Sequence, residues 1–287
     1  MTAQTKATTG AEPAREERIL RRKGVGIETN RMDQVYRLIS IFSPFIVLIL
    51  WEITVQVGIL DRRFFPPPTR VIGVLSQMVI SGELWEHLGI SLQRIVFGFL
   101  LGSIPGILIG LLMGWSKAVR AFVDPIVAAT YPIPKISLLP LLLVIFGLGE
   151  ASKVVTVAIA GFFLVLISTA HGVMRIDPIL VQAAQNYGAT GWKLFAKVIL
   201  PASLPSIFTG LRLSLGVSLL IIVAAEFVAA NRGIGYLIWI SWSTLSVGKM
   251  YVGLVVIAVL GLLFTNGLER MGQALMPWAQ DIQQRTR

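Results

Sequence analysis

Long apolar segments, separated by short polar ones, recur along this chain and limit the folds that it can adopt. A helix needs roughly 20 apolar residues to cross a hydrocarbon core about 30 Å thick. Such segments are predicted at about 37–59, 91–115, 136–148, 153–173, 210–230 and 250–271. Inside a bilayer every backbone group must be paired within the protein, which favours helices. The sequence therefore predicts an all-α, polytopic membrane protein of about six transmembrane helices.

The composition excludes most other classes of protein. Hydrophobic residues make up 55% of the chain and charged residues only 14%, against about 25% charged in an ordinary soluble domain. The chain has no cysteine, so catalytic thiols, zinc–thiolate centres and iron–sulfur clusters are excluded. Two histidines, His87 and His171, argue against a metal cluster. We expect no catalytic residue, no metal and no cofactor.

The net charge of +10 is interpreted as a signal of orientation, because Lys and Arg collect in cytoplasmic loops. With the N-terminus inside, sixteen basic residues fall on the inner side and six on the outer side. Orientation explains the basic N-terminal tail more simply than nucleic acid binding does. The sequence thus predicts a flexible cytoplasmic tail at 1–35, a transmembrane domain at 36–272 and a cytoplasmic tail at 273–287.

Five glycines recur every four residues in the second predicted span. On a helix this spacing makes a bare stripe along one face, which lets a second helix approach to backbone distance. Tolerance of glycine in membrane helices is the alternative explanation, but five in register favour packing. The stripe consists of Gly98, Gly102, Gly106, Gly110 and Gly114.

A proline-rich break before the third predicted span is a candidate part of a translocation path. Tyr131, Pro132 and Pro134, with Ser137 nearby, interrupt the helix and free backbone groups that protein or cavity water must satisfy. Broken helices commonly line transport sites. A kink needed only for packing is the alternative.

Two polar residues of the fifth predicted span, Ser218 and Glu226, complete the candidate path. Intramembrane charges are costly and are functional candidates. Glu226 is either a gate residue near the outer mouth or an interfacial carboxylate, bonded to the loop 231–235 or paired with Arg232. A carboxylate would repel an anionic solute, which argues against direct binding of an anion.

The inner segment at about 174–205 is predicted to form two short helices. Asp177 can cap the first, with Pro178 at its first position, and Gly188 suits a left-handed stop. Thr190 can cap the second helix, and the prolines at 201 and 205 are expected to stop it. Such a hairpin suits docking against another protein, although an interfacial hairpin packed on the membrane has the same pattern.

This hairpin resembles the "EAA" signature of permease subunits of ABC importers. That signature reads Glu-Ala-Ala, three residues, Gly, nine residues, Ile, one residue, Leu-Pro. The spacing matches throughout, while Gln replaces the usual Glu and Val replaces Ile. The Gln removes a negative charge but keeps size and hydrogen-bonding capacity, so docking is expected to survive. The matching residues are Gln182, Ala183, Ala184, Gly188, Val198, Leu200 and Pro201.

The resemblance extends over about 65–270 and is closest to the branch that imports nitrate, sulfonates, taurine and bicarbonate. It implies the type I importer fold, with a five-helix core plus an N-terminal helix, in a bacterial inner membrane. It also implies two ABC ATPase subunits, a second permease copy, a periplasmic or lipid-anchored binding protein and alternating access. The solute is expected to be small and anionic.

The chain itself lacks the phosphate-binding pattern of an ATPase. A P-loop needs Gly-x4-Gly-Lys-Ser/Thr, and the one Gly-Lys pair, Gly248-Lys249, is followed by Met250. ATP hydrolysis is therefore expected on a partner chain. The alternatives are an ion-coupled secondary transporter or channel, which leaves the signature unexplained, and a membrane-embedded enzyme, which would need clustered His, Asp or Glu.

Overall fold

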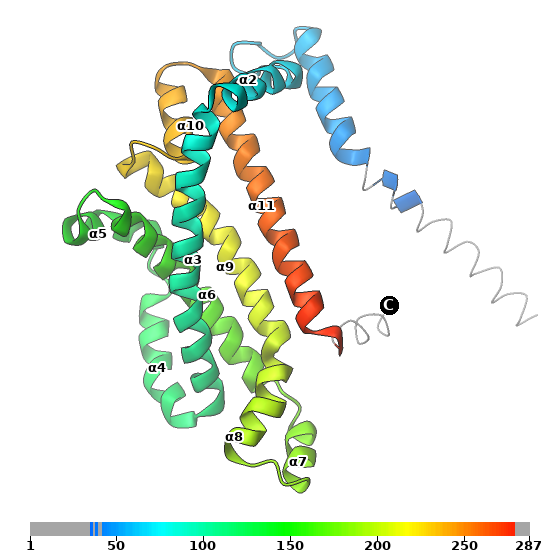
Figure 1. The fold of residues 1–287 in the computed structure, drawn as a ribbon, viewed down its shortest axis with the longest axis vertical. Coiled ribbons are helices and arrows are strands. Elements are labelled where there is room, and N and C mark those ends of the chain that lie inside the picture. Colours follow the sequence, from blue (N-terminus) through cyan, green and yellow to red (C-terminus); the bar gives the residue numbers. More distant parts are fainter. Residues whose placement is uncertain (1–34, 37, 40–41, 279–287) are drawn as a thin grey trace, which may run out of the picture. The chain divides into compact units, whose positions relative to one another are not determined.

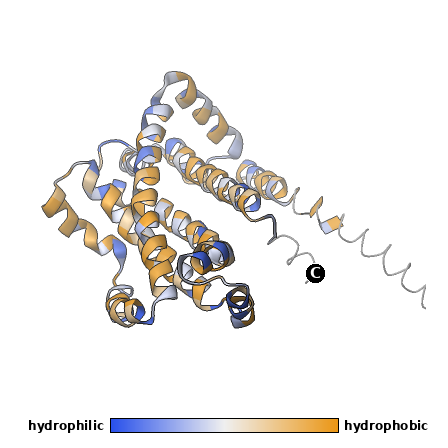
Figure 2. Ribbon diagram, turned by 60° about the horizontal axis from the view of Figure 1, so that its bottom comes forward, coloured by the Kyte–Doolittle hydropathy of each residue, from blue (hydrophilic) through white to orange (hydrophobic). Residues whose placement is uncertain are grey.

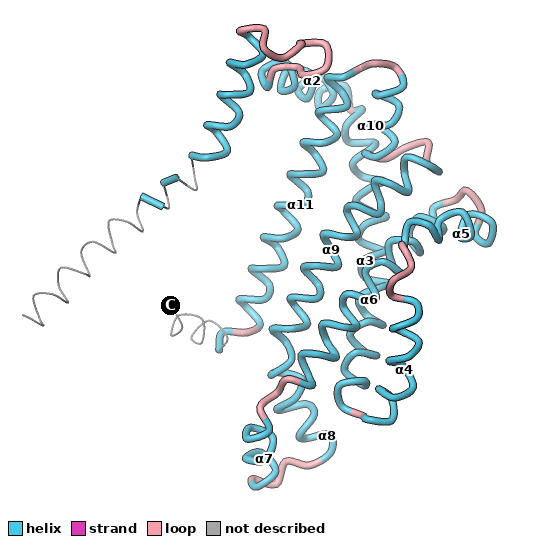
Figure 3. Tube along the Cα trace, turned by 180° about the vertical axis from the view of Figure 1, so that it is seen from behind, coloured by secondary structure: helices cyan, strands magenta, loops and turns pink. Residues whose placement is uncertain are grey.

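A computed structural model describes residues 35–36, 38–39 and 42–278 of the chain. These residues form helices joined by turns, and no strand occurs among them (Figure 3). The chain divides into two units, Met1–Thr69 and Arg70–Arg287. The predicted tails at 1–35 and 273–287 fall largely outside the described residues and stay predictions.

The first unit contains the apolar helix Phe42–Gln56. It ends before the predicted limit at 59, and residues 37 and 40–41 of the predicted span lie outside the described residues. The Glu52 carboxylate accepts hydrogen bonds from the Thr69 backbone N–H at 3.1 Å and from its hydroxyl at 3.0 Å. Thr69 lies in the first turn of helix α2 (Pro68–Ser81), where backbone N–H groups lack helical partners. Glu52 therefore has a structural role here.

Four long apolar helices dominate the second unit: α3 (Glu83–Trp115), α6 (Glu150–Met174), α9 (Leu200–Ala229) and α11 (Val247–Leu275). They run side by side in Figure 1, and Figure 2 shows that their middle turns are hydrophobic. Among the described residues, four helical runs are long and apolar enough to cross a membrane, or five if one bent pair counts as a single span.

The glycine stripe of α3 lies against α6. A Cβ added to Gly98 would stand 2.7 Å from Val157 Cβ, and one added to Gly110 would stand 2.7 Å from the Leu166 carbonyl oxygen. At Gly102 it would collide with the Ala158 backbone. Helix α6 meets α9 in the same way, with Gly161 against Ser214. The small residues thus bring three helices to backbone distance.

The bent pair joins α4 (Lys117–Thr130) to the 3-10 turn η1 (Lys135–Leu138) and α5 (Leu139–Phe146), at an angle of 87°. Helix α4 begins directly after α3, because the Ser116 side chain caps it and accepts a hydrogen bond from the Val119 N–H. The third span predicted at 136–148 is only the η1–α5 segment, and it reaches membrane length only together with α4.

At one end of the bundle α7 (Pro178–Asn186) and α8 (Gly191–Leu194) form a hairpin (Figure 1). A π-turn, η2 (Phe195–Ile199), then leads directly into α9. The expected stop at Pro201 and Pro205 was wrong, because helical backbone continues from Gly191 to Ala229. Pro201 directly follows the wider π-turn, where the regular ladder is already interrupted. The predicted loop at 174–205 accordingly contains the start of α9.

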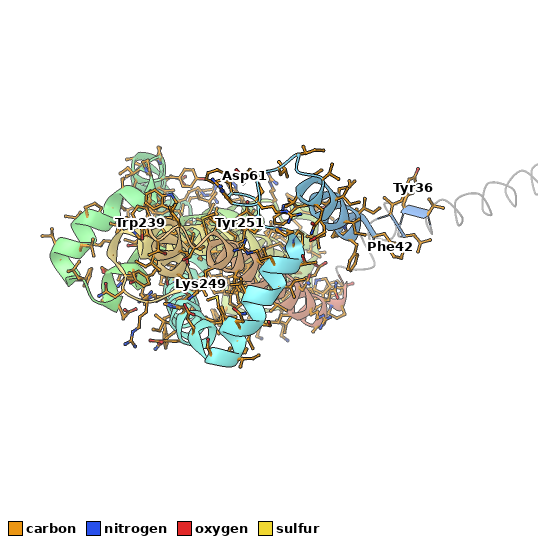
Figure 4. The ribbon with its side chains drawn as sticks, turned by 90° about the horizontal axis from the view of Figure 1, so that it is seen from above. Tyr36, Phe42, Asp61, Trp239, Lys249 and Tyr251 are labelled. Carbon is orange, nitrogen blue, oxygen red and sulfur yellow. The ribbon has the colours of Figure 1, made fainter. Side chains whose placement is uncertain are left out.

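At the opposite end lies α10 (Ile234–Ser243), a short helix between α9 and α11. Its buried face, Ile234, Leu237 and Ile238, packs with Val71 of α2 and Val252 of α11. Figure 4 looks onto this end and labels Trp239 of α10 and Lys249 of α11. The spacing of the buried residues is helical, so packing made this segment a helix.

Candidate functional sites

The hairpin formed by α7 and α8 is organised by local backbone rules. The Asp177 carboxylate accepts a hydrogen bond from the Ile179 N–H at 2.8 Å, and Pro178 takes the first helical position. Gly188 has φ +79. The Gly188 N–H donates to the Gln185 carbonyl at 2.9 Å and the Ala189 N–H to the Ala184 carbonyl at 3.0 Å. This pair of bonds is a Schellman motif, which requires a left-handed residue where Gly188 stands.

The second helix of the hairpin begins after Thr190, as expected, but the Thr190 side chain makes no capping hydrogen bond. The Trp192 ring stacks on Phe195 at 5.2 Å between centroids, and Phe195 meets Trp115 edge-on at 5.3 Å. These rings join the hairpin to the end of α3.

The outer face of α7 is an exposed, largely uncharged stripe. Its members recur at i, i+3, i+4, i+7 and i+8, which places them on one helical face. Tyr187 is 95% exposed and Ile179 is 72% exposed. The stripe, named here the α7 stripe, consists of Ile179, Gln182, Ala183, Asn186 and Tyr187, all exposed.

The remaining signature residues face the bundle instead. Ala184, Val198 and Leu200 pack against a buried cluster that includes Leu111 of α3 and Val173 of α6. Pro201 begins α9 and is half-buried. The signature thus divides into an outward part, Gln182 and Ala183, and a part that fixes the hairpin on the bundle.

The proline break between α4 and η1 is capped by a lysine. The Lys135 ammonium donates to the Thr130 carbonyl at 2.7 Å and to the Tyr131 carbonyl at 3.0 Å. These are the last carbonyl of α4 and that of its C-cap residue, where carbonyls lack partners within the helix. The ammonium also lies 4.2 Å from the centroid of the Phe163 ring. The Ser137 hydroxyl donates to the Pro134 carbonyl at 2.6 Å.

The side chains of the break remain accessible. Tyr131 is 47% exposed, and Pro132 and Pro134 are exposed as well. Ser218, by contrast, is fully buried on α9 and donates to the Ser214 carbonyl at 2.8 Å. The break therefore faces outward from the unit, whereas Ser218 lies inside its packing.

Glu226 is fully buried and its carboxylate is surrounded by donors. The Ser91 hydroxyl lies 2.8 and 2.9 Å from its two oxygens, and the Arg94 guanidinium lies 2.7 Å from Oε1. The Gly235 N–H donates to Oε2 at 2.7 Å. The carboxylate thus sits at the start of α10, where backbone N–H groups favour an anion.

Of the two bonds considered for an interfacial Glu226, the structure has the bond to the loop 231–235 and not the pair with Arg232. The loop bond comes through Gly235, whereas Arg232 pairs with Glu86 at 3.2 Å. A Cβ on Gly233, where φ is +127, would run into the Glu226 carboxylate. The glycine therefore makes room for the buried acid.

The family comparison agrees with this architecture. Residues 106–275 match the family described as "Binding-protein-dependent transport system inner membrane component". The chain belongs to this family. The resemblance inferred from the signature in this hairpin is confirmed: the chain is a transmembrane permease subunit of an ATP-binding-cassette importer, a transport protein.

Curated relatives cover most of the permease. The taurine transport system permease protein TauC of Escherichia coli (strain K12) is 35% identical over 250 residues, 85% of this chain and 91% of TauC. The putative aliphatic sulfonates transport permease protein SsuC of Bacillus subtilis (strain 168) is 33% identical over 239 residues, 83% of this chain and 87% of SsuC.

A solved structure supports the fold. The crystal structure of an amino acid ABC transporter with histidines aligns with a TM-score of 0.53 and 19% sequence identity, over 71% of the permease and 97% of that chain. This likeness shows the importer permease fold alone.

Arg94 is the polar residue of the permease that the sequence analysis missed. It is nearly fully buried and pairs with both Glu226 and Glu150, and it donates to the Arg232 carbonyl at 2.7 Å. Its four-residue spacing from the glycine stripe, at Gly98, was a usable signal, because it places Arg94 on the buried face of α3.

Proposed function

We propose that the permease imports a small organic sulfonate delivered by a binding protein. The relatives that support this substrate class are described as transporting taurine and aliphatic sulfonates. The importer we propose contains two copies of the permease and two separate ATPase subunits. A periplasmic or lipid-anchored binding protein supplies the solute.

The α7 stripe is the surface to which we assign docking of the ATPase. Bulky apolar side chains such as Ile179 and Tyr187 stand exposed on a short helix fixed at both ends by capping bonds. Exposed apolar groups that lie together, outside the membrane-length helices, are typical of a surface that binds another protein. With Gln182 in place of an acidic residue, the docking contact is apolar and hydrogen-bonded rather than ionic.

The proline break and α5 support a path between two permease copies. Val144 is 84% exposed and Leu148 is 76% exposed, and the broken backbone at Tyr131–Pro134 stands on the same bent pair. Lipid cannot satisfy irregular backbone, so such a break is tolerated only against protein or water. We assign Tyr131, Pro132, Pro134 and Ser137 to the path, and Ser218 and Glu226 to packing.

The proposed orientation places the α7 end in the cytoplasm of a bacterial inner membrane. Arg175, Lys193 and Lys197 belong to the hairpin region, and basic residues favour the cytoplasmic side. The α10 end then faces outward, toward the binding protein, and both termini are cytoplasmic.

The test is assembly and uptake with the ATPase encoded next to the permease gene. Ala183→Trp places a large ring in the α7 stripe, whereas Gln185→Trp places the same ring on the flank of the helix. Co-purification with the ATPase and ATP-dependent taurine uptake in proteoliposomes are expected to fail for Ala183→Trp and to persist for Gln185→Trp. Equal behaviour of the two variants would remove the docking assignment.

The same proteoliposomes test the energy source and the substrate class independently. Uptake that follows an ion gradient without ATP would favour the secondary transporter. ATP-driven uptake of another solute, with no response to taurine or an alkanesulfonate, would overturn the substrate class alone.

A further inference from the structure

Two carboxylates share Arg94, and they differ in their exposure to water. The Glu226 side chain is 0% exposed, whereas that of Glu150 is 62% exposed. Glu150 receives two bonds from the guanidinium, one of them from Nη2 at 2.7 Å. Freeing a buried carboxylate is costly, whereas an exposed one is readily hydrated. Of the two contacts that Arg94 makes with carboxylates, the one with Glu150 is therefore the one that can open.

Glu150 stands where the bent pair joins the bundle. It is the first residue of α6 and follows a turn with Gly147, at φ +76, and Gly149. A Cβ on either glycine would meet nothing within 4 Å. The glycines of this turn are thus not required by close packing, and they leave its backbone free to change conformation.

A second cation holds the same turn. The side chain of Lys153 is only 2% exposed, and its ammonium lies 3.6 Å from Glu150. It donates to the Leu148 carbonyl at 3.2 Å and to the Gly149 carbonyl at 3.1 Å. The turn is therefore tied to α3 through Arg94 and to α6 through Lys153.

We propose that the Arg94–Glu150 contact is a releasable clamp that controls movement of α5 against the α3–α6–α9 bundle during transport. Arg94 is a positioning residue: it keeps Glu226 as a permanent partner and releases Glu150 when the turn 147–149 opens. This inference rests on the proposed ATP-driven cycle. Helix α5 suits such a movement, because it packs mainly on α6 and leaves its other face exposed.

A thiol reporter tests the clamp directly, because the chain contains no cysteine. Ser152 is fully buried in the first turn of α6 and bonds to the Gly149 carbonyl. Ser152→Cys introduces a thiol of similar size that a charged, membrane-impermeant methanethiosulfonate reaches only when the turn opens. In the purified full-length permease, labelling is expected to be several-fold faster with Glu150→Gln and faster still with Glu150→Ala.

Glu86→Gln is the matched control, because Glu86 forms an exposed ion pair with the Arg232 side chain in the same region, whereas Arg94 bonds to the Arg232 backbone carbonyl. It should label at the parental rate. Equal rates in all variants would overturn the clamp. In the reconstituted complex, labelling should also rise with ATP and binding protein. Faster labelling in the Glu150 variants without that rise would overturn its role in the cycle.

The two parts of the experiment keep the proposals separate. Labelling of the permease without its ATPase tests the clamp whatever the substrate is. If the parental protein showed no ATP-driven uptake while the labelling rate still depended on Glu150, the result would count against the proposed function and not against the clamp. Yield and thermal unfolding of each variant establish that the reporter reads a folded protein.

Discussion

The guanidinium of Arg94 lies 2.7 Å from the buried carboxylate of Glu226, 132 residues further along the chain. This pair joins α3 to α9 inside the bundle, and neither side chain has appreciable contact with solvent. The stability of the bundle at this point therefore depends on both charges being present.

Removing one member of this pair is expected to destabilise the permease strongly. Arg94→Met leaves a buried unpaired carboxylate, at a cost of about 3–5 kcal/mol in the free energy of unfolding. Glu226→Gln should cost less, because Arg94 keeps Glu150. The double variant should cost less than the sum of the two. Unfolding in detergent measures all three, and strict additivity would contradict the pairing.

The glycine stripe predicts a position-dependent penalty for a single methyl group. Gly102→Ala drives a Cβ into the Ala158 backbone, and overpacking of this kind typically costs about 1–3 kcal/mol. Gly216→Ala is the control, because a Cβ there meets nothing within 4 Å in α9. It should be neutral or stabilising by up to about 1 kcal/mol. Thermal unfolding in detergent distinguishes them, and similar effects at both sites would contradict the packing.

Helix-capping rules predicted the α7–α8 hairpin, but rules that use only neighbouring residues did not predict long-range contacts. Asp177, Pro178 and Gly188 act on backbone groups within a few residues, so the helix start and stop were readable and are confirmed. The partner of Glu226 could not be predicted in this way, because Arg94 is distant in sequence while Arg232 is near. Proline rules also failed at Pro201, where a π-turn lets the helix continue.

Gly188 gives a prediction that depends on backbone conformation alone. A Cβ there meets nothing within 4 Å, but φ is +79. Gly188→Ala should therefore cost about 1–2 kcal/mol through left-handed strain and weaken ATPase co-purification. Gly188→Asn should cost less, because Asn tolerates this region better. If Ala were tolerated as well as Asn, strain would not be the cause.

Lys135 offers a test of the proline break. Lys135→Met removes a donor to the Thr130 and Tyr131 carbonyls. The Thr130 carbonyl keeps its bond from the Ile133 N–H at 3.3 Å, whereas the Tyr131 carbonyl loses this partner, and an unsatisfied carbonyl costs about 1–3 kcal/mol when desolvated. Uptake is expected to fall several-fold. Lys135→Arg keeps donors and charge and should retain most activity. Transport assays at matched protein levels provide the comparison, and full activity of Lys135→Met would show that the cap is dispensable.

Helical backbone runs without an intervening loop for 39 residues, from Gly191 beside the α7 hairpin to Ala229 near Glu226. At 1.5 Å per residue this is a rod of roughly 58 Å. In the docking and orientation proposed above, a push on the hairpin by the ATPase is transmitted along this continuous helix to its far end, where Arg94 binds Glu226. In that mechanism, work done at the α7 end of the permease is delivered at the α10 end.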